Sequence, residues 1–152
     1  MWLQLRNIFL AGAASLVLFA ALASASDHHR LNGTWRLAPT QSEFNGQPAI
    51  QTGMVTINDR QNNIYISRNF NYDGANQSFE YTFTVDGREN ASVKEGKAFK
   101  VKAKWDDDAL QVKTTQSDTV TTERYTLAPD GTMILLVERP GHSALALHFQ
   151  RQ

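Results

Sequence analysis

The chain has 152 residues, of which 41% are hydrophobic and 20% are charged, and its 15 basic residues are balanced by 15 acidic ones. This length and composition predict one folded domain and exclude a largely disordered chain. Because the charges balance, there is no overall field that would attract nucleic acid or an anionic membrane, and we expect neither as a partner of the folded domain.

Residues 1–25 have the pattern of a secretory signal peptide. One basic residue, Arg6, precedes an apolar run over residues 8–23, and Ala23 and Ala25 form an A-x-A cleavage site. We therefore expect a secreted protein, periplasmic or extracellular, that is cleaved after Ala25. A retained membrane anchor is the alternative, although the run is short for a span of about 20 residues. The absence of cysteine is more typical of a bacterial periplasm than of an animal secretory route.

Residues 26–33 are expected to form a flexible arm ahead of the folded domain. Cleavage after Ala25 would make His28 the third residue of the mature chain. A terminal amine, two backbone amides and an imidazole then offer four nitrogens in a plane, which suits Cu(II) or Ni(II). His28 is a weak metal-ligand candidate on this ground; the sequence predicts no other metal site and no cofactor.

From residue 34 to residue 152 the dominant hydrophobic period is two, which is typical of half-buried β-strands. FEYTFTV at residues 79–85 and FKVKAKW at residues 99–105 both alternate apolar with polar side chains. Gly-containing turns such as Asp86-Gly87 and Asp130-Gly131 separate these segments. The pattern predicts about ten strands. They start near Thr34, Gly53, Asn63, Gln77, Glu89, Ala98, Ala109, Thr119, Met133 and Ala144.

Short turns between consecutive strands predict a single antiparallel up-and-down meander of about 8–10 strands. No segment after Ser26 has the 3.6-residue period of an amphipathic helix. A long meander has to close or stack, because an open twisted sheet leaves unpaired edges. The predicted fold is therefore an all-β barrel in one domain, with a β-sandwich as the alternative.

Three short motifs follow one another along the chain: NGTW at residues 32–35, KWDDDAL at 104–110 and ERYTLAPDGTMILLVER at 123–139. In this order they resemble the small exported lipocalin-like domains of bacteria, within the calycin group of lipocalins and fatty-acid-binding proteins. The resemblance implies a calycin-type barrel with a Gly-x-Trp start, in which Trp35 plugs one end beside Gly33. It also implies an arginine from the last strand over that tryptophan; Arg151 either has this role or is a frayed terminal residue.

The chain departs from the fatty-acid-binding proteins between the first two strands. Residues 39–52 number only 14 and include a Gly and a Pro, which is too little for the helix pair that covers the portal in those proteins. The predicted barrel therefore has no helical lid, and the resemblance does not by itself imply a bound fatty acid.

Arg68 stands out because it shares the inward parity of Phe70 and Tyr72 in the segment IYISRNFNY. An unpaired guanidinium is costly to bury, so a partner is needed. Three interpretations are open: a ligand carboxylate, an internal pair with Glu123, or a β-bulge that turns Arg68 outward. The sequence does not decide whether the inward aromatic residues line a cavity or fill it. The ligand-binding candidates are Arg68, Phe70, Tyr72, Tyr81, Phe83, Trp105 and Tyr125.

The sequence contains no nucleophile elbow, zinc-protease helix or phosphate-binding glycine loop, so we expect a protein that is not an enzyme. The predicted function is an exported, monomeric binding module for a small hydrophobic or amphiphilic molecule. This ligand class includes molecules that carry a carboxylate. The alternative is a periplasmic barrel-type proteinase inhibitor that acts through its N-terminal arm, or another protein-interaction module. A cavity of about 300 Å³ or more favours the binding module, and a filled interior favours the alternative.

Overall fold

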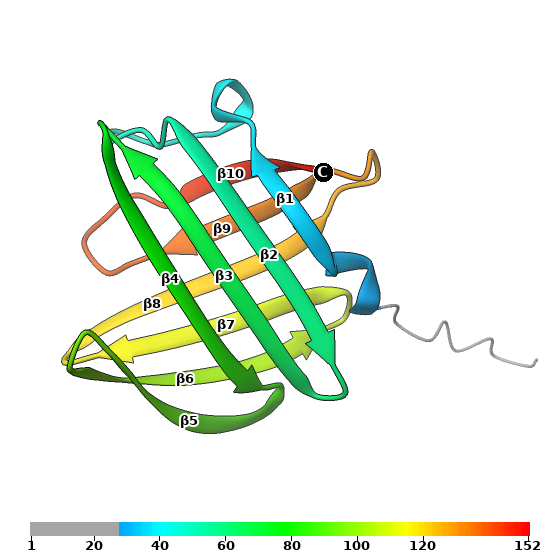
Figure 1. Ribbon diagram of the computed structural model, residues 1–152, viewed down its shortest axis with the longest axis vertical. Helices are drawn as coiled ribbons and strands as arrows, with labels where there is room; N and C mark the ends of the chain where they lie inside the picture. The colour runs from blue at the N-terminus through cyan, green and yellow to red at the C-terminus, as the bar shows by residue number, and fades with distance from the viewer. Residues whose placement is uncertain (1–27) are drawn as a thin grey trace, which may run out of the picture.

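The computed structural model describes residues 28–152. The predicted signal peptide, its cleavage site and residues 26–27 of the predicted metal-binding terminus lie outside the described residues. Within them, ten strands form one antiparallel sheet, and the helical content is two short 3-10 turns (Figure 1). No helix in this part of the chain combines the length and the hydrophobicity that a membrane span requires.

The strands begin within three residues of their predicted starts, so alternation and turn sequences located all ten. The 3-10 turns are η1 (His28–Leu31) and η2 (Pro39–Gln41). The strands are β1 (Gly33–Leu37), β2 (Thr52–Arg60), β3 (Asn63–Tyr72), β4 (Ala75–Thr84), β5 (Asp86–Lys94), β6 (Lys97–Asp106), β7 (Ala109–Gln116), β8 (Thr119–Leu127), β9 (Met133–Glu138) and β10 (Leu145–Arg151).

The strand order is that of an up-and-down barrel. It runs β4-β3-β2-β1-β10-β9-β8-β7-β6-β5, so every neighbour in the sheet is a neighbour in the chain except β1 and β10. That pair joins the two ends of the meander, with Trp35 opposite Arg151 and Leu37 opposite Phe149. The prediction of an all-β up-and-down meander is confirmed; the meander forms a nearly closed barrel, and the sandwich alternative is wrong.

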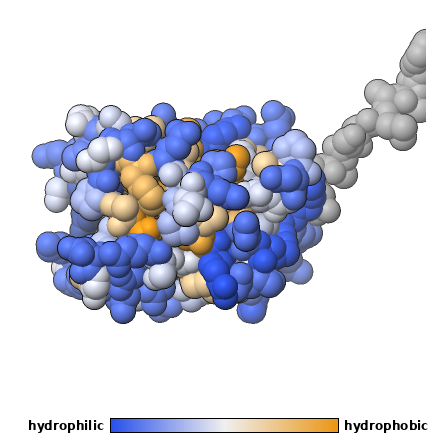
Figure 2. Space-filling view, turned by 90° about the horizontal axis from the view of Figure 1, so that it is seen from above, coloured by the Kyte–Doolittle hydropathy of each residue, from blue (hydrophilic) through white to orange (hydrophobic). Residues whose placement is uncertain are grey.

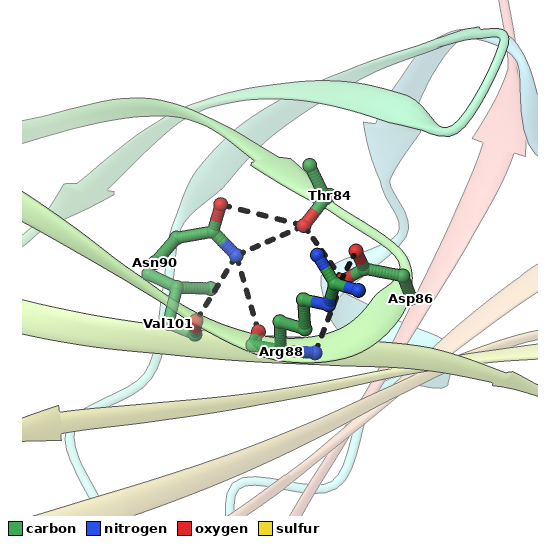
Figure 3. A network of polar contacts seen from close by, with 5 residues as sticks. All are labelled: Thr84, Asp86, Arg88, Asn90 and Val101. Carbon is green, nitrogen blue, oxygen red and sulfur yellow. Dashed lines mark hydrogen bonds and ion pairs between the residues drawn. The ribbon is translucent and has the colours of Figure 1, made fainter.

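The barrel is incomplete between β4 and β5, which lie at the two ends of the strand order and share no ladder. Side chains hold their hairpin instead (Figure 3). The Asn90 side-chain amide donates to Thr84 Oγ1 at 3.2 Å and to the Val101 carbonyl at 3.4 Å, which ties β5 to both neighbours. Asp86 accepts from the Thr84 hydroxyl at 2.9 Å and from the Arg88 amide at 3.0 Å.

No helix pair covers the barrel between β1 and β2, as predicted. After η2 the chain returns to β10, where Glu43 pairs with Ala146. Asn45 Nδ2 then donates to the Ala144 carbonyl and Gln47 Nε2 to the Ser143 carbonyl. Residues 38–51 therefore form a strap along β10 and the β9–β10 hairpin.

One end of the barrel is plugged by Trp35, which is fully buried and donates its indole N–H to the Leu31 carbonyl at 2.9 Å. The Arg151 guanidinium lies 4.2 Å from the Trp35 ring centroid and donates to the Asn32 carbonyl, so Arg151 covers the plug. Gly33 has a φ of 130°, and a Cβ there would stand 2.7 Å from Arg151 Nη1. The positive φ favours glycine at this position, and a side chain there would also have to displace the guanidinium of Arg151.

Of the segment expected to be a flexible arm, residues 28–33 lie within the described part of the chain and have a defined structure. Residues 28–31 form η1 against the plugged end, with Leu31 buried, and β1 begins at Gly33 rather than at residue 34. The His28 ring stacks on Trp105, with centroids 3.9 Å apart. The physical reason for the difference is that Leu31 and the two rings bury apolar surface at the barrel end, which fixes the segment.

Large apolar side chains fill the half of the barrel near Trp35. Among the fully buried ones are Ile57, Ile66, Phe83 and Leu135. The outside is mainly hydrophilic, and Figure 2 shows hydrophobic residues in a limited band on one face. The interior of the barrel is therefore solid in the half near Trp35.

The plug predicts a ranked loss of stability. Trp35→Ala should lower the free energy of unfolding by about 3–5 kcal/mol, the range for a large core aromatic residue. Arg151→Ala should lower it by about 1–2 kcal/mol through the lost cation–π contact and packing. Urea unfolding measures both, with the exposed Arg36→Ala on the same strand as a control expected to change it by less than about 0.5 kcal/mol. An unchanged unfolding curve for Trp35→Ala would refute the plug.

Candidate functional site: a cavity at the open end of the barrel

A cavity of about 350 Å³ opens at the end of the barrel away from Trp35. Its walls come from both sides of the barrel, near the β3–β4, β7–β8 and β9–β10 hairpins, and combine apolar with polar side chains. The lining residues are Arg68, Phe70, Tyr72, Gln77, Phe79, Lys94, Gln116, Thr121, Glu123, Val137, Arg139, Leu145 and Leu147.

A buried ion pair crosses the barrel at this cavity. Arg68 on β3 donates from Nη1 to Glu123 Oε1 on β8, and the two side chains are 16% and 5% exposed. Two tyrosine hydroxyls donate to the other carboxylate oxygen, Tyr125 at 2.9 Å and Tyr81 at 3.2 Å. Of the three interpretations of Arg68, the structure therefore shows the internal pair with Glu123.

Aromatic rings support the guanidinium from the β4 side. The Arg68 Cζ atom lies 5.3 Å from the centroid of Phe79 and 5.8 Å from that of Tyr81. Cation–π contacts of this kind gain strength when water is excluded. No buried side-chain polar atom in the described part of the chain lacks a hydrogen-bond partner, so the cluster is fully satisfied.

Burial and the ion pair shift the pKa values of the groups in the cluster. Burial is the largest single effect on Arg68 and would lower its pKa, but the negative charge of Glu123, together with Tyr125, Tyr81 and the hydrogen bond to Glu123, outweighs burial and raises the pKa well above its ordinary value. Burial, followed by the nearby Glu123 charge, raises the pKa of both Tyr81 and Tyr125. Both tyrosines therefore remain proton donors to the carboxylate across the neutral range.

Arg68, Phe70 and Tyr72 are the predicted ligand-binding residues that the structure brings to the cavity. Tyr81 and Tyr125 do not line it; they contact Glu123 from the filled side.

The other two predicted residues lie elsewhere. Phe83 is 1% exposed and belongs to the core, and Trp105 is at the plugged end under His28. Strand parity shows that these side chains point inward, but it does not show how far along the barrel axis each one lies.

The other lining residues were not among the ligand-binding candidates, and three of them bear most on the chemistry of the cavity: Phe79, Lys94 and Arg139. Phe79 shares parity with Tyr81, so the signal was present in the alternation. Lys94 is the last residue of β5, a strand whose inward positions are polar, and Arg139 directly follows β9. The alternation of apolar and polar residues therefore did not indicate either side chain as a cavity residue. Lys94 Nζ lies 4.2 Å from the Phe79 ring centroid, and Arg139 Nη2 lies 3.5 Å from Gln47 Oε1 of the strap.

The chemistry of the site is that of a binding cavity. Glu123 is the only carboxylate among the lining residues, and both its oxygens already accept hydrogen bonds from protein donors. Within residues 28–152, no three His, Asp or Glu side chains gather in a way that would hold a metal ion. Nε2 of His28, the weak metal candidate, lies 3.2 Å from the Asp107 carbonyl oxygen.

No protein-family model matches the chain, and no curated protein matches its sequence. Solved structures match its fold. Secretory abundant heat soluble protein 4 from Ramazzottius varieornatus is 15% identical with a TM-score of 0.62, over 81% of this chain and 95% of that one. The REP1-NXSQ fatty acid transporter is 17% identical with a TM-score of 0.62, over 80% and 96%.

Fatty-acid-binding protein 1 from Echinococcus granulosus is 10% identical with a TM-score of 0.61, over 81% of this chain and 98% of that one. At these identities the likeness shows the fold alone. The structural neighbours are barrels of the calycin type, which agrees with the architecture that the sequence motifs implied.

The ion pair predicts strong coupling between two substitutions. Arg68→Met and Glu123→Gln should each cost about 3–5 kcal/mol, since each leaves one buried group without its partner. The double variant should cost less than the sum of the two, with a coupling energy of about 1–3 kcal/mol, because neither charge is then left alone. Urea unfolding of the four proteins measures the cycle; additive losses would contradict the pair.

The raised tyrosine pKa values predict a loss of stability at alkaline pH. The folded state keeps the protons of Tyr81 and Tyr125 at a pH where the unfolded chain, with pKa near 10.0, loses them. Their contribution is therefore complete below about pH 10 and is lost as pH rises further. Urea unfolding between pH 8 and pH 11 should show a smaller fall for Tyr125→Phe than for the parent protein. Equal pH slopes would refute this assignment.

Proposed function

We propose that this protein is an exported, non-enzymatic carrier that holds a small, partly apolar molecule in the barrel cavity. The observation that carries the proposal is the cavity itself, whose volume of about 350 Å³ lies within the usual range for small-molecule sites. Phe70, Val137, Leu145 and Leu147 supply apolar wall, and burying a ligand against them is favourable by about 25 cal/mol per Å².

The fold neighbours support a ligand of this class. One carries the name of a fatty acid transporter and another that of a fatty-acid-binding protein, on barrels that superpose over about four fifths of this chain. We propose that this protein likewise binds a small hydrophobic or amphiphilic ligand. The strap over residues 38–51 replaces a helix pair, so the cavity is less covered, and micromolar or weaker affinity is expected.

We propose export because residues 1–25 have the pattern of a signal peptide. We propose a bacterial source because the chain has no cysteine and because its motifs resemble those of bacterial exported domains. A monomer is proposed because large apolar side chains are scarce on the outside. Within residues 28–152 only Met54 and Val93 are large, hydrophobic and exposed. Met54 is on β2 and Val93 on β5, which are not neighbours in the sheet, so these two side chains do not combine into a broad apolar patch of the kind that marks an interface.

The proteinase-inhibitor alternative receives less support. It calls for a free N-terminal arm and a filled interior, whereas residues 28–31 pack on the plugged end and the other end is hollow. The engaged Glu123 likewise favours binding over catalysis.

Filling the cavity should weaken ligand binding. Thr121 is a partly exposed lining residue on β8, and its side chain is not part of the apolar core. Thr121→Trp is expected to weaken binding of an environment-sensitive dye or a medium-chain fatty acid by about tenfold or more, while Thr122→Trp, on the opposite face of the strand, leaves it unchanged. Fluorescence titration makes the comparison. Absence of any binding to the parent protein at millimolar concentration would overturn the carrier proposal.

A further inference from the structure

The deep charge in the cavity is already neutralised by the protein. Arg68 is the innermost cation of the lining, and its guanidinium pairs with Glu123 rather than facing an empty anion site. A ligand carboxylate could bind Arg68 only by displacing a carboxylate that also accepts two tyrosine hydrogen bonds. That exchange leaves Glu123 buried and without its counter-charge, which costs several kcal/mol. The floor of the cavity therefore disfavours an acidic group.

The mouth of the cavity has the opposite character. Lys94 and Arg139 both line it, and none of the ion pairs found within residues 28–152 includes either one. Lys94 is held over the Phe79 ring, and Arg139 is within reach of the Gln47 side chain of the strap. The four charged lining residues thus comprise a neutral pair at the floor and two cations without an acidic partner at the rim.

Acidic residues do occur near this end, at the hairpin tips. Asp73, Glu95 and Asp118 lie in the β3–β4, β5–β6 and β7–β8 turns, but none of them lines the cavity. Exposed charges outside the cavity are screened by salt more than charges within it. A ligand atom inside the mouth therefore meets the two cations first.

We propose that the ligand is an amphiphile with an anionic head group, bound with the head at the mouth against Lys94 and Arg139 and the apolar body pointing toward the Arg68–Glu123 floor. This rests on the proposed carrier function and adds the charge and the orientation of the ligand. Lys94 and Arg139 are its specificity-determining residues. The acidic head group thus keeps part of its hydration at the rim. Only the apolar body enters the interior, so binding buries no additional charge that would need a partner.

The test compares three ligands of one chain length: decanoate, 1-decanol and decylamine. Each displaces a neutral environment-sensitive dye from the purified protein at low salt. Decanoate should bind about tenfold more tightly than decanol and decylamine most weakly, and the preference should shrink as salt is raised. Lys94→Gln combined with Arg139→Gln should remove most of the advantage of decanoate and leave decanol unchanged.

Two further variants locate the anchor. Lys102→Gln changes an exposed lysine on the outside of β6 and should keep the decanoate preference, which controls for net charge. The double variant Arg68→Met with Glu123→Gln should also keep it, because the head group does not use that pair. Loss of the preference in that double variant, or its retention in the Lys94 and Arg139 double variant, overturns the inference while the carrier function stands. Binding of none of the three ligands overturns both.

Discussion

The ion pair between Arg68 and Glu123 is the constraint on which the interior of this barrel depends. It joins β3 to β8 across the barrel, with Tyr81 and Tyr125 completing the hydrogen bonds of the carboxylate. Buried charges are tolerated only when they are paired and hydrogen-bonded, so these four side chains hold one another in place. Their position divides the interior into a solid half and a hollow half.

Each half uses aromatic residues differently. Toward the plugged end, Trp35 and Phe83 fill space and are closed off by Arg151 and η1, which stabilises a chain that contains no cysteine and therefore no disulfide. Toward the open end, Phe70 and Phe79 line the cavity. Because the solid half and the β1–β10 closure carry the fold, the other end is free to keep a cavity and a discontinuity between β4 and β5. A barrel of this kind needs no helical lid to be stable.

Strand alternation and turn chemistry are local, and they were sufficient to predict ten strands, their order and the closure of the barrel. They also placed Arg68 on the inward face. They did not place Trp105 at the plugged end or Phe83 below the cavity, because parity has no information about depth along the barrel axis. Lys94 and Arg139 were missed for a related reason: the rim of a cavity is formed where strands end, and there the alternation stops. The choice of Glu123 as the partner of Arg68 depends on packing across the barrel, which the sequence left open.

Because the protein's own Glu123 already pairs with Arg68 inside the barrel, we expect an acidic ligand to bind with its head group outward. Nuclear Overhauser contacts between bound decanoate and assigned side chains test it most directly. We expect contacts from the terminal methyl group to Leu147 and Val137, beside the floor, and from the carbon next to the carboxylate to Lys94 and Arg139. Contacts in the reverse sense, with the methyl group at Lys94 and the carboxylate end at Arg68, would contradict it.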